Sequence, residues 1–266
     1  MKQVVFRCAF LGTEYCGWQV QAHRVRGPKK SVQEVFESCL SKIFDTRIKV
    51  RASGRTDAGV HALSLAVQAT LPKAIELDKL VRGLNSLLPH DIRVLEARSV
   101  PEHFDVQKSA KLKRYTYFLQ QGPCELPHLV PTSWWIRKKL DLPAMKKALR
   151  ILEGHHEFRV FQASGGVTKT TDRTIFRTTV QRVPVRWPPV ASTVLGKDFS
   201  LIRVSIEGSG FLKQMVRSIV GTLVPVGEER KPVTIFRSLL ESQDRKLLGP
   251  TAPARGLWLE WVKYRD

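Results

Sequence analysis

Apolar residues recur every three or four positions along residues 31–44, which is the spacing of one face of an α-helix. Ser31 and Glu34 stand at the spacing of a capping box, in which side chains and backbone bond each other at the helix start. The pattern therefore predicts a helix that begins at Ser31 and buries one face. The buried face would consist of Val32, Val35, Phe36, Cys39, Leu40 and Ile43.

Runs rich in apolar residues, with partial alternation and turn residues at their ends, are typical of strands and surround this helix. In the first hundred residues, the predicted order is strand, helix, strand, strand, helix, strand. The second helix, residues 78–88, would be capped by Asp78 and stopped by Pro89. The strands are expected at residues 2–12, 48–54, 63–71 and 91–100.

The second half of the chain repeats this mixture. The stretch of residues 141–154 predicts a helix with Pro143 in its first turn and Gly154 just past its end. Residues 211–227 are apolar enough for a buried helix, but their two charges and Pro225 argue against a membrane span. Further strands are expected at residues 112–121, 173–185, 199–208 and 256–264, and a short helix at residues 234–242.

Two halves of similar make-up predict an α+β fold with a pseudo-symmetric pair of domains, residues 1–106 and 107–266. The chain of 266 residues is long enough to bury a sizeable core in each. A cleft between two such halves is a common place for a ligand.

The charge of the chain indicates a class of ligand. Lys and Arg number 44 against 24 Asp and Glu, a formal charge of +20, which favours polyanions and above all nucleic acid. The cations lie in several segments (24–30, 108–115, 136–139 and around Arg217), as expected of a folded surface that follows a phosphate backbone. An anionic membrane would require a basic amphipathic helix or a lipid signal, and the sequence has neither.

Four cysteines without metal-ligand spacing are expected to be reduced and mostly structural. The first residues alternate like a strand and do not resemble a secretory signal. We therefore expect a soluble intracellular protein, in the cytoplasm or the mitochondrion.

The stretch GRTDAGVHA, which begins at Gly54, holds one acid in a glycine-rich turn after a predicted strand. Gly54 and Gly59 allow a tight turn and close approach of a partner, so that Asp57 is either a catalytic carboxylate or ordinary turn chemistry. Arg55 would favour the ionised acid or grip a phosphate. His61 is expected to be a hydrogen-bonded structural residue.

In KLKRYTYFL, Tyr115 and Tyr117 share one face of a predicted strand, and Lys111, Lys113 and Arg114 add charge. Stacking on an unstacked base and packing in the core are equally good interpretations of the tyrosines.

Arg217 interrupts an apolar helix, where a charge is costly unless it is paired or serves a site. A pair with Asp57 is one interpretation, and a surface stripe with Lys213 is the other. Adjacent His155 and His156 point in different directions on any regular element, and are expected to be structural.

Together these motifs resemble the TruA family of tRNA pseudouridine synthases, and most closely its animal branch. The resemblance covers nearly the whole chain and is carried by the motifs YCGWQ, SVQE, GRTDAGVHA, LNSLLPHDIRV, RYTY, GHHEFRVF, FLKQMVRSIVG and APARGLWLEWV, in the family's order.

The resemblance implies a role for each candidate residue. Asp57 would be the catalytic aspartate, Tyr115 would stack on the target uracil and assist a proton transfer, and Arg217 would pair with the aspartate. Arg55 would help to displace the target nucleotide. The basic residues expected to contact the substrate beside Arg55 and Tyr115 are Lys113, Arg114 and Lys213.

The same resemblance implies antiparallel sheets flanked by helices around a central basic cleft, with no cofactor and no metal. Its implied substrate is tRNA, in or near the anticodon stem-loop, and its implied assembly a homodimer. Two alternatives from other classes are a catalytically idle RNA-binding protein and a metal-dependent nuclease. The nuclease would need further acids near Asp57, which the sequence lacks.

Two segments depart from the family pattern. Residues 104–107 read FDVQ where the family commonly has F-H-A-R, and the basic insertion at residues 24–30 is longer than in compact bacterial members. Both changes are expected in loops that contact the substrate, and both leave the candidate catalytic residues intact.

Overall fold

The computed structural model describes residues 2–20, 29–166, 168, 170–185 and 199–264. Internal packing divides the chain into two compact units. Unit 1 consists of Met1–Lys113 together with Trp258–Asp266, and unit 2 of Arg114–Leu257. The boundary expected between residues 106 and 107 stays a prediction, since compactness alone does not show where an independently folding domain ends.

The sheet of unit 1 has the strand order β4-β1-β3-β10, and β2 pairs with β3. The β1 strand pairs antiparallel with both β3 and β4, whereas β10 runs parallel to β3 and brings Trp258 opposite His61. The C-terminal strand therefore returns to the sheet of the N-terminal unit. The strands are β1 (Lys2–Phe10), β2 (Val50–Ala52), β3 (His61–Leu71), β4 (Ile92–Ser99) and β10 (Leu257–Tyr264).

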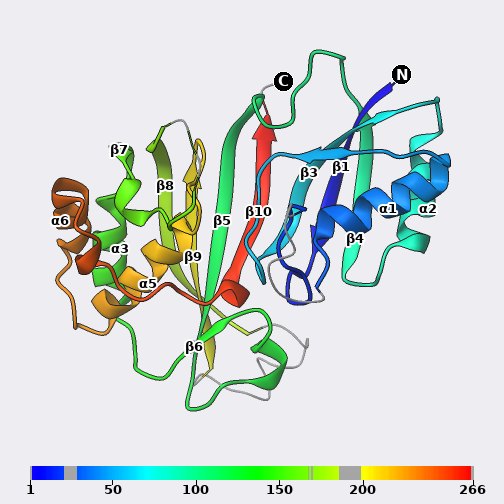
Figure 1. Ribbon diagram of the computed structural model, residues 1–266. Coiled ribbons are helices and arrows are strands. Elements are labelled where there is room, and N and C mark those ends of the chain that lie inside the picture. The colour runs from blue at the N-terminus through cyan, green and yellow to red at the C-terminus, as the bar shows by residue number, and fades with distance from the viewer. Residues whose placement is uncertain (1, 21–28, 167, 169, 186–198, 265–266) are drawn as a thin grey trace. The chain divides into compact units, whose positions relative to one another are not determined.

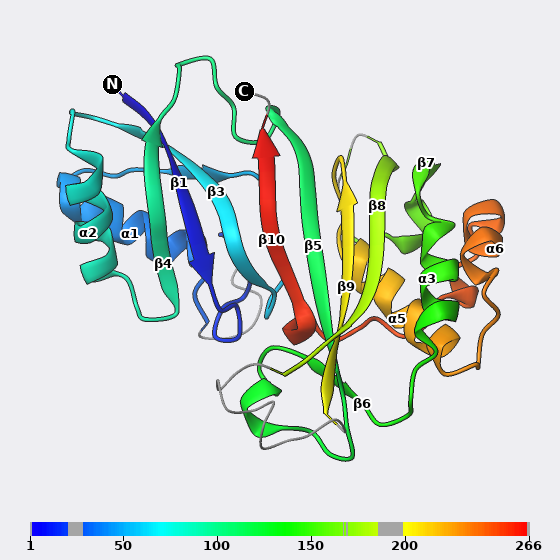
Figure 2. The ribbon, with the colours of Figure 1, turned by 180° about the vertical axis from the view of Figure 1, so that it is seen from behind.

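Two helices, α1 (Val32–Phe44) and α2 (Leu77–Leu87), cover one face of β1, β3 and β4 (Figure 1, and from behind in Figure 2). Phe6 of β1 and Phe36 of α1 meet edge to face in this layer, with ring centroids 5.5 Å apart. Leu80 and Leu84 of α2 are buried there as well. The opposite face of the sheet carries a smaller cluster built on Val5, Ala66 and Val106.

The predicted capping box at the start of α1 is confirmed. Ser31 is fully buried, its Oγ accepts from the Glu34 backbone N–H at 3.2 Å, and its own N–H donates to Glu34 Oε2 at 2.7 Å. The pair satisfies two backbone donors of the first turn that the helix itself leaves without acceptors.

We expect Ser31→Ala to lower the free energy of unfolding by about 1 kcal/mol, because one of these donors loses its acceptor. Urea unfolding followed by circular dichroism measures this change. Ser38→Ala, at an exposed position of the same helix, is the matched control and is expected to be neutral or slightly stabilising. Equal losses from the two variants would show that the box does not stabilise the helix.

In unit 2 the strand order is β5-β9-β8-β7, and β6 pairs parallel with β5. The helices α3 and α5 contact each other, and α3 also lies against β8 (Figure 2). Phe158, Phe161 and Phe236 are fully buried beside these helices. The elements are β5 (Ala110–Gln121), β6 (Trp134–Ile136), β7 (Gly154–Glu157), β8 (Asp172–Val183), β9 (Ser200–Gly208), α3 (Leu142–Arg150), α5 (Met215–Gly227) and α6 (Ile235–Ser242).

The predicted fold class, helix-flanked and largely antiparallel α+β, is confirmed, and so is the element order of the first hundred residues. Pseudo-symmetry and the central basic cleft stay predictions. None of the helices in the described ranges has the length and apolarity that a membrane span requires.

Three helix boundaries were predicted wrongly. The helix expected over residues 141–154 already ends at Arg150, and Gly154 begins β7 instead of following the helix. Asp78 is not the cap of α2, since the helix already begins at Leu77 and Asp78 lies in its first turn. The helix expected from residue 211 begins only at Met215, because Gln214 before it has the left-handed φ of 59°. Lys213 therefore precedes α5 and forms no helical stripe with Arg217.

Candidate active site

Asp57 lies in a turn between β2 and β3. The turn is closed by a hydrogen bond from the Val60 N–H to the Asp57 carbonyl at 3.1 Å, and Asp57 itself is half-buried. Its neighbour Thr56 is buried, with its carbonyl accepting from the Trp18 N–H at 3.1 Å. The backbone on the N-terminal side of the acid is thus fixed by a second loop.

That second loop is the YCGWQ stretch, and Gly17 lets it approach. Gly17 has a φ of +107°, and a Cβ on it would lie 2.6 Å from the Thr56 carbonyl oxygen and 3.1 Å from the Asp57 carbonyl carbon. Only a residue without a side chain accommodates both the conformation and the contact. The YCGWQ loop after β1 and the GRTDAGVHA turn after β2 therefore pack against each other at Asp57.

His61, the first residue of β3, binds the loop that follows β1. It is fully buried, its Nδ1 accepts from the Gly12 N–H at 3.0 Å, and its ring lies 4.4 Å from that of Trp258. An Nδ1 that accepts carries no proton, so the imidazole is bound as a structural acceptor. The prediction of a structural histidine is confirmed.

Lys113 lies beside the same turn. Its Nζ donates to the Ser53 carbonyl at 2.6 Å and would lie 3.6 Å from a Cβ on Gly54. Lys113 therefore lies at the N-terminal end of the turn that carries Asp57, and Arg55 is exposed at the start of the turn. Contact of Lys113 and Arg55 with a substrate stays a prediction.

The FDVQ segment is firmly bound within unit 1. Asp105 accepts from the N–H groups of Gln107 and Lys108 and forms an ion pair with Arg51 at 3.1 Å. The hydrogen bond from the Lys108 N–H has the largest effect on the Asp105 carboxylate. Together with the other contacts it outweighs partial burial, so the pKa of Asp105 lies below its usual range. Gln107 donates to the Ala52 carbonyl at 3.0 Å, so the segment that departs from the family pattern is part of the support of β2.

In unit 2, the two tyrosines of β5 lie on one face as predicted, but they differ in what they contact. Tyr115 is 8% exposed and packs edge to face on Phe211, with centroids 5.0 Å apart. Tyr117 is fully buried, and its hydroxyl donates to the Pro253 carbonyl at 2.7 Å. Burial raises the pKa of Tyr117, so its phenol stays neutral. Tyr117 is therefore a core residue.

Arg114 points to the other face of β5. It donates from two guanidinium nitrogens to Glu207 of β9, and Thr116 beside it meets Ser205 of the same strand. Alternate residues of a strand face opposite sides, so Arg114 and Tyr115 serve opposite faces of this sheet. A substrate contact by Arg114 stays a prediction, and within unit 2 its established partner is Glu207.

Arg217 lies in the first turn of α5. In this helix, which the structure describes in full, it is the one residue that is not buried. Its Nε donates to the Ala252 carbonyl at 2.8 Å, and the Ala252 N–H donates to the Arg217 carbonyl at 3.2 Å. The expected pair with Asp57 stays a prediction. Lys213 is exposed and donates to the Ser164 carbonyl at 3.2 Å.

The sequence predictions missed the contacts of the segment 249–253, which supports both Arg217 and Tyr117 and whose last two residues begin the motif APARGLWLEWV. It crosses α5 at Gly221, where a Cβ would lie only 1.6 Å from the Pro250 carbonyl oxygen. The Gly249 N–H donates to Thr222 Oγ1 at 2.9 Å, one helical position further on. The small residues Gly221 and Thr222 are a sequence signal of this crossing.

The neighbouring histidines 155 and 156 bond separate partners, Thr174 and the Glu153 carbonyl, which confirms the structural prediction. Among the residues that the structure describes, no group of three or more His, Cys, Asp and Glu side chains is arranged to hold a metal ion. Most of the basic insertion, residues 24–28, lies outside the described residues.

Comparison with known proteins identifies the family. A family model described as tRNA pseudouridine synthase matches residues 8–107 and 148–265, a range that includes Asp57 and Arg217 but not Tyr115. The chain is 38% identical over 266 residues to tRNA pseudouridine synthase A of Myxococcus xanthus, covering 100% of this chain and 93% of the relative. It is 37% identical over 264 residues to the protein of the same name from Pelobacter propionicus, and this match covers 99% of this chain and 100% of the relative.

Among solved structures, an H/ACA RNP bound to a substrate RNA containing 2'-deoxyuridine aligns at 14% identity and a TM-score of 0.32, over 92% of this chain and 59% of that chain. A TM-score this low carries no argument of its own. The family model matches most of the chain, and the identity to curated relatives extends from end to end. The chain belongs to the tRNA pseudouridine synthase family.

Proposed function

We propose that this protein isomerises uridine to pseudouridine in tRNA. The observation that carries the proposal is the end-to-end match to curated tRNA pseudouridine synthases A, at more than a third of positions. It is supported by the turn around Asp57, which packs against the loop at Gly17 and Trp18 and is followed by the buried His61, bound to Gly12. Such support from a rigid shell is typical of a catalytic side chain.

The reaction explains why a carboxylate suffices. The N1–C1′ bond of the uridine breaks, the uracil turns, a C5–C1′ bond forms, the proton on C5 is lost, and N1 takes up a proton. We propose that Asp57 acts on the ribose, either as a nucleophile at C1′ or as a base, and both routes regenerate the carboxylate. Neither route requires a redox partner, because the product is an isomer of the substrate.

The remaining roles follow from the motif positions. Tyr115 is proposed to stack on the target uracil and to assist the late proton transfer, and Arg217 to pair with Asp57. Arg55 is proposed to help to displace the target nucleotide, at a cost of roughly a few kcal/mol for unstacking. Lys113, Arg114 and Lys213 are proposed to contact the RNA, and the formal charge of +20 supports attraction to the phosphate backbone.

The finer assignments rest on the resemblance alone. We propose a target uridine in or near the anticodon stem-loop, a homodimer, and an intracellular location. The relatives compared above are bacterial, and they lend no support to the animal branch or to a mitochondrial location.

The proposal is tested with tRNA transcripts that carry tritium at C5 of uridine. We expect the wild-type protein to release tritium and to leave pseudouridine that mass spectrometry locates in the product. No release from any tRNA pool, together with tight binding, would instead identify an RNA-binding protein without activity. Magnesium-dependent cleavage of the RNA would favour a nuclease.

Two conservative variants on one strand separate the proposed chemistry from packing. Tyr115→Phe is expected to lower the rate of tritium release about a hundredfold, within the range for a lost acid or base, while tRNA still binds. Tyr117→Phe is the control: it removes the bond to Pro253 and is expected to cost about 1 kcal/mol of stability with little loss of rate. Equal rates in the two variants would contradict the role of Tyr115.

A further inference from the structure

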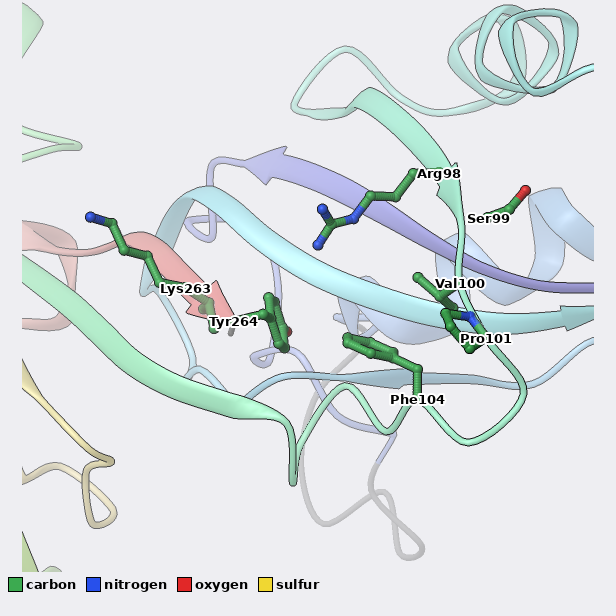
Figure 3. Close-up of a pocket in the computed structure, with 8 residues that line it drawn as sticks. Arg98, Ser99, Val100, Pro101, Phe104, Lys263 and Tyr264 are labelled. Atoms are coloured by element: carbon green, nitrogen blue, oxygen red, sulfur yellow. The ribbon is translucent and has the colours of Figure 1, made fainter. Parts of the chain in front are cut away.

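Unit 1 contains a pocket that none of the predicted site residues lines. It has a volume of about 530 Å³ and lies between the ends of β4 and β10 and the loop that follows β4 (Figure 3). This volume falls within the range of roughly 300–1,000 Å³ that is typical of ligand sites. The side chains that matter for its chemistry are Arg98, Val100, Pro101, Phe104, Lys263 and Tyr264.

The apolar wall of the pocket is preformed. Phe104 and Tyr264 pack against the cluster of Val5, Ala66 and Val106, with their ring centroids 5.2 Å apart. Gln68 fixes the loop by accepting from the Val106 N–H at 2.9 Å and donating to the Phe104 carbonyl at 2.7 Å. Because the two rings already touch, a planar ligand would pack against their outer side, with Val100 and Pro101, and not between them.

Tyr264 contributes an uncharged ring to this wall. Its hydroxyl donates to the Val106 carbonyl at 3.1 Å, and burial raises its pKa to about 12. The ring therefore stays neutral at physiological pH and offers a surface for stacking, which is worth about 1–3 kcal/mol per base in single-stranded nucleic acid complexes.

The charges at the pocket are positive. Of the eight described residues that line it, two are cations and none is an acid. Arg98 is exposed and extends from β4 toward the two rings, whereas Lys263 points away from them and lies 4.9 Å over the Trp261 ring (Figure 3). Arg98 is thus the group placed to bind an anion next to the apolar wall.

The residues that line the pocket are not those of the Asp57 turn, although both belong to unit 1. The turn starts at Ser53, whose N–H donates to the carbonyl of Ala66 at 2.9 Å beside the cluster under the two rings, and it ends at His61, opposite Trp258. At a rise of about 3.3 Å per residue, Tyr264 lies about 20 Å from Trp258 along β10. The pocket therefore has its own lining residues, on the side of the turn where Ser53 lies.

We propose that this pocket binds a second nucleotide of the RNA substrate, distinct from the target uridine, with its base on the wall of Val100, Pro101, Phe104 and Tyr264 and its phosphate on Arg98. The proposal rests on the proposed function in one respect, namely that the RNA substrate is tRNA. It assigns to the pocket the positioning of the RNA at a fixed distance from the reacting nucleotide.

Reversal of the charge at Arg98 tests the site. We expect Arg98→Glu to weaken binding of unmodified tRNA about tenfold at about 0.1 M salt, and to reduce the slope of log affinity against log salt by about 1 or more. Arg82→Glu is the matched control: it makes the same charge change at an exposed position of α2, on the opposite face of the sheet, and is expected to change affinity less than twofold. Equal effects of the two variants would overturn the proposal.

A second measurement distinguishes a nucleotide of the RNA from a free one. Ultraviolet cross-linking of the wild-type protein to tRNA is expected to join the peptide containing Phe104 to a nucleotide other than the target uridine. If UMP instead saturates the pocket at micromolar concentration, and tRNA affinity does not depend on Arg98, the pocket is a small-molecule site and the proposal is wrong.

The tritium assay keeps this test separate from the proposed function. If the wild-type protein releases tritium but Arg98→Glu does not change tRNA binding, the proposal for the pocket is wrong and the proposed function stands. Binding that depends on Arg98 in a protein that releases no tritium would refute the isomerase and leave an RNA contact in place.

Discussion

Asp57→Ala is expected to stop the release of tritium from 5-tritiated uridine in tRNA while tRNA binding largely survives. The rate should fall by at least about a thousandfold, because both proposed routes begin with the carboxylate and no other group replaces it. Binding should change little, because most of the affinity for RNA comes from contacts with the phosphate backbone. Single-turnover tritium release and filter binding on the same preparations give the two values.

Three comparisons make this result specific. Asp57→Asn keeps the size of the side chain and is expected to be as inactive as the alanine variant, since an amide is neither a nucleophile nor a base at this step. Asp78→Ala removes one exposed acid of α2 and is expected to keep the wild-type rate. Circular dichroism of all variants checks the fold. Release at the wild-type rate from Asp57→Ala would end the isomerase proposal as it is stated.

The features that could be predicted from the sequence are those that short stretches determine. The capping box of Ser31 and Glu34 spans four residues, and the glycine turn around Asp57 is equally local, so both were found without knowledge of the fold. Strands such as β8 and β9 were found because a half-buried strand alternates along its own length.

What could not be predicted depends on pairs of residues far apart in the chain. The contact between Arg114 and Glu207 spans 93 positions, so the sequence did not show that this cation beside a tyrosine also forms an ion pair. Tyr115 and Tyr117 are equivalent in the sequence pattern, and only the Pro253 carbonyl, 136 positions away, makes Tyr117 a core residue. The pocket at Arg98 likewise requires β10 to return to the first unit.

The crossing of residues 249–253 over α5 shows how such a distant contact positions a candidate site residue. Arg217 is bound twice to Ala252, and Tyr117 is bound to the next residue, so a displacement of this segment would disturb both. The closest approach lies at Gly221, beside the Pro250 carbonyl. Substitution at Gly221 therefore tests whether this approach sets the stability of unit 2 and the position of Arg217.

Gly221→Ala is expected to lower the free energy of unfolding by about 3 kcal/mol and to reduce the rate of tritium release. The added Cβ would lie 1.6 Å from the Pro250 carbonyl oxygen, so either the backbone of α5 or that of the 249–253 segment must move. Overpacking of this kind costs about 1–3 kcal/mol, and loss of the bonds from Gly249 and Ala252 to α5 adds roughly 1 kcal/mol each. The rate falls because the displaced Ala252 no longer holds the Arg217 guanidinium.

Gly83→Ala is the matched control, since Gly83 also lies inside a helix but has space around it. A Cβ there would lie 3.7 Å from Ile43 Cδ1, an ordinary contact, and alanine favours a helix over glycine by roughly 0.5–1 kcal/mol. Urea unfolding should therefore shift in opposite directions for the two variants. If Gly221→Ala is as stable and as active as Gly83→Ala, the close approach of the 249–253 segment is not what holds Arg217, and its position must depend on other contacts of α5.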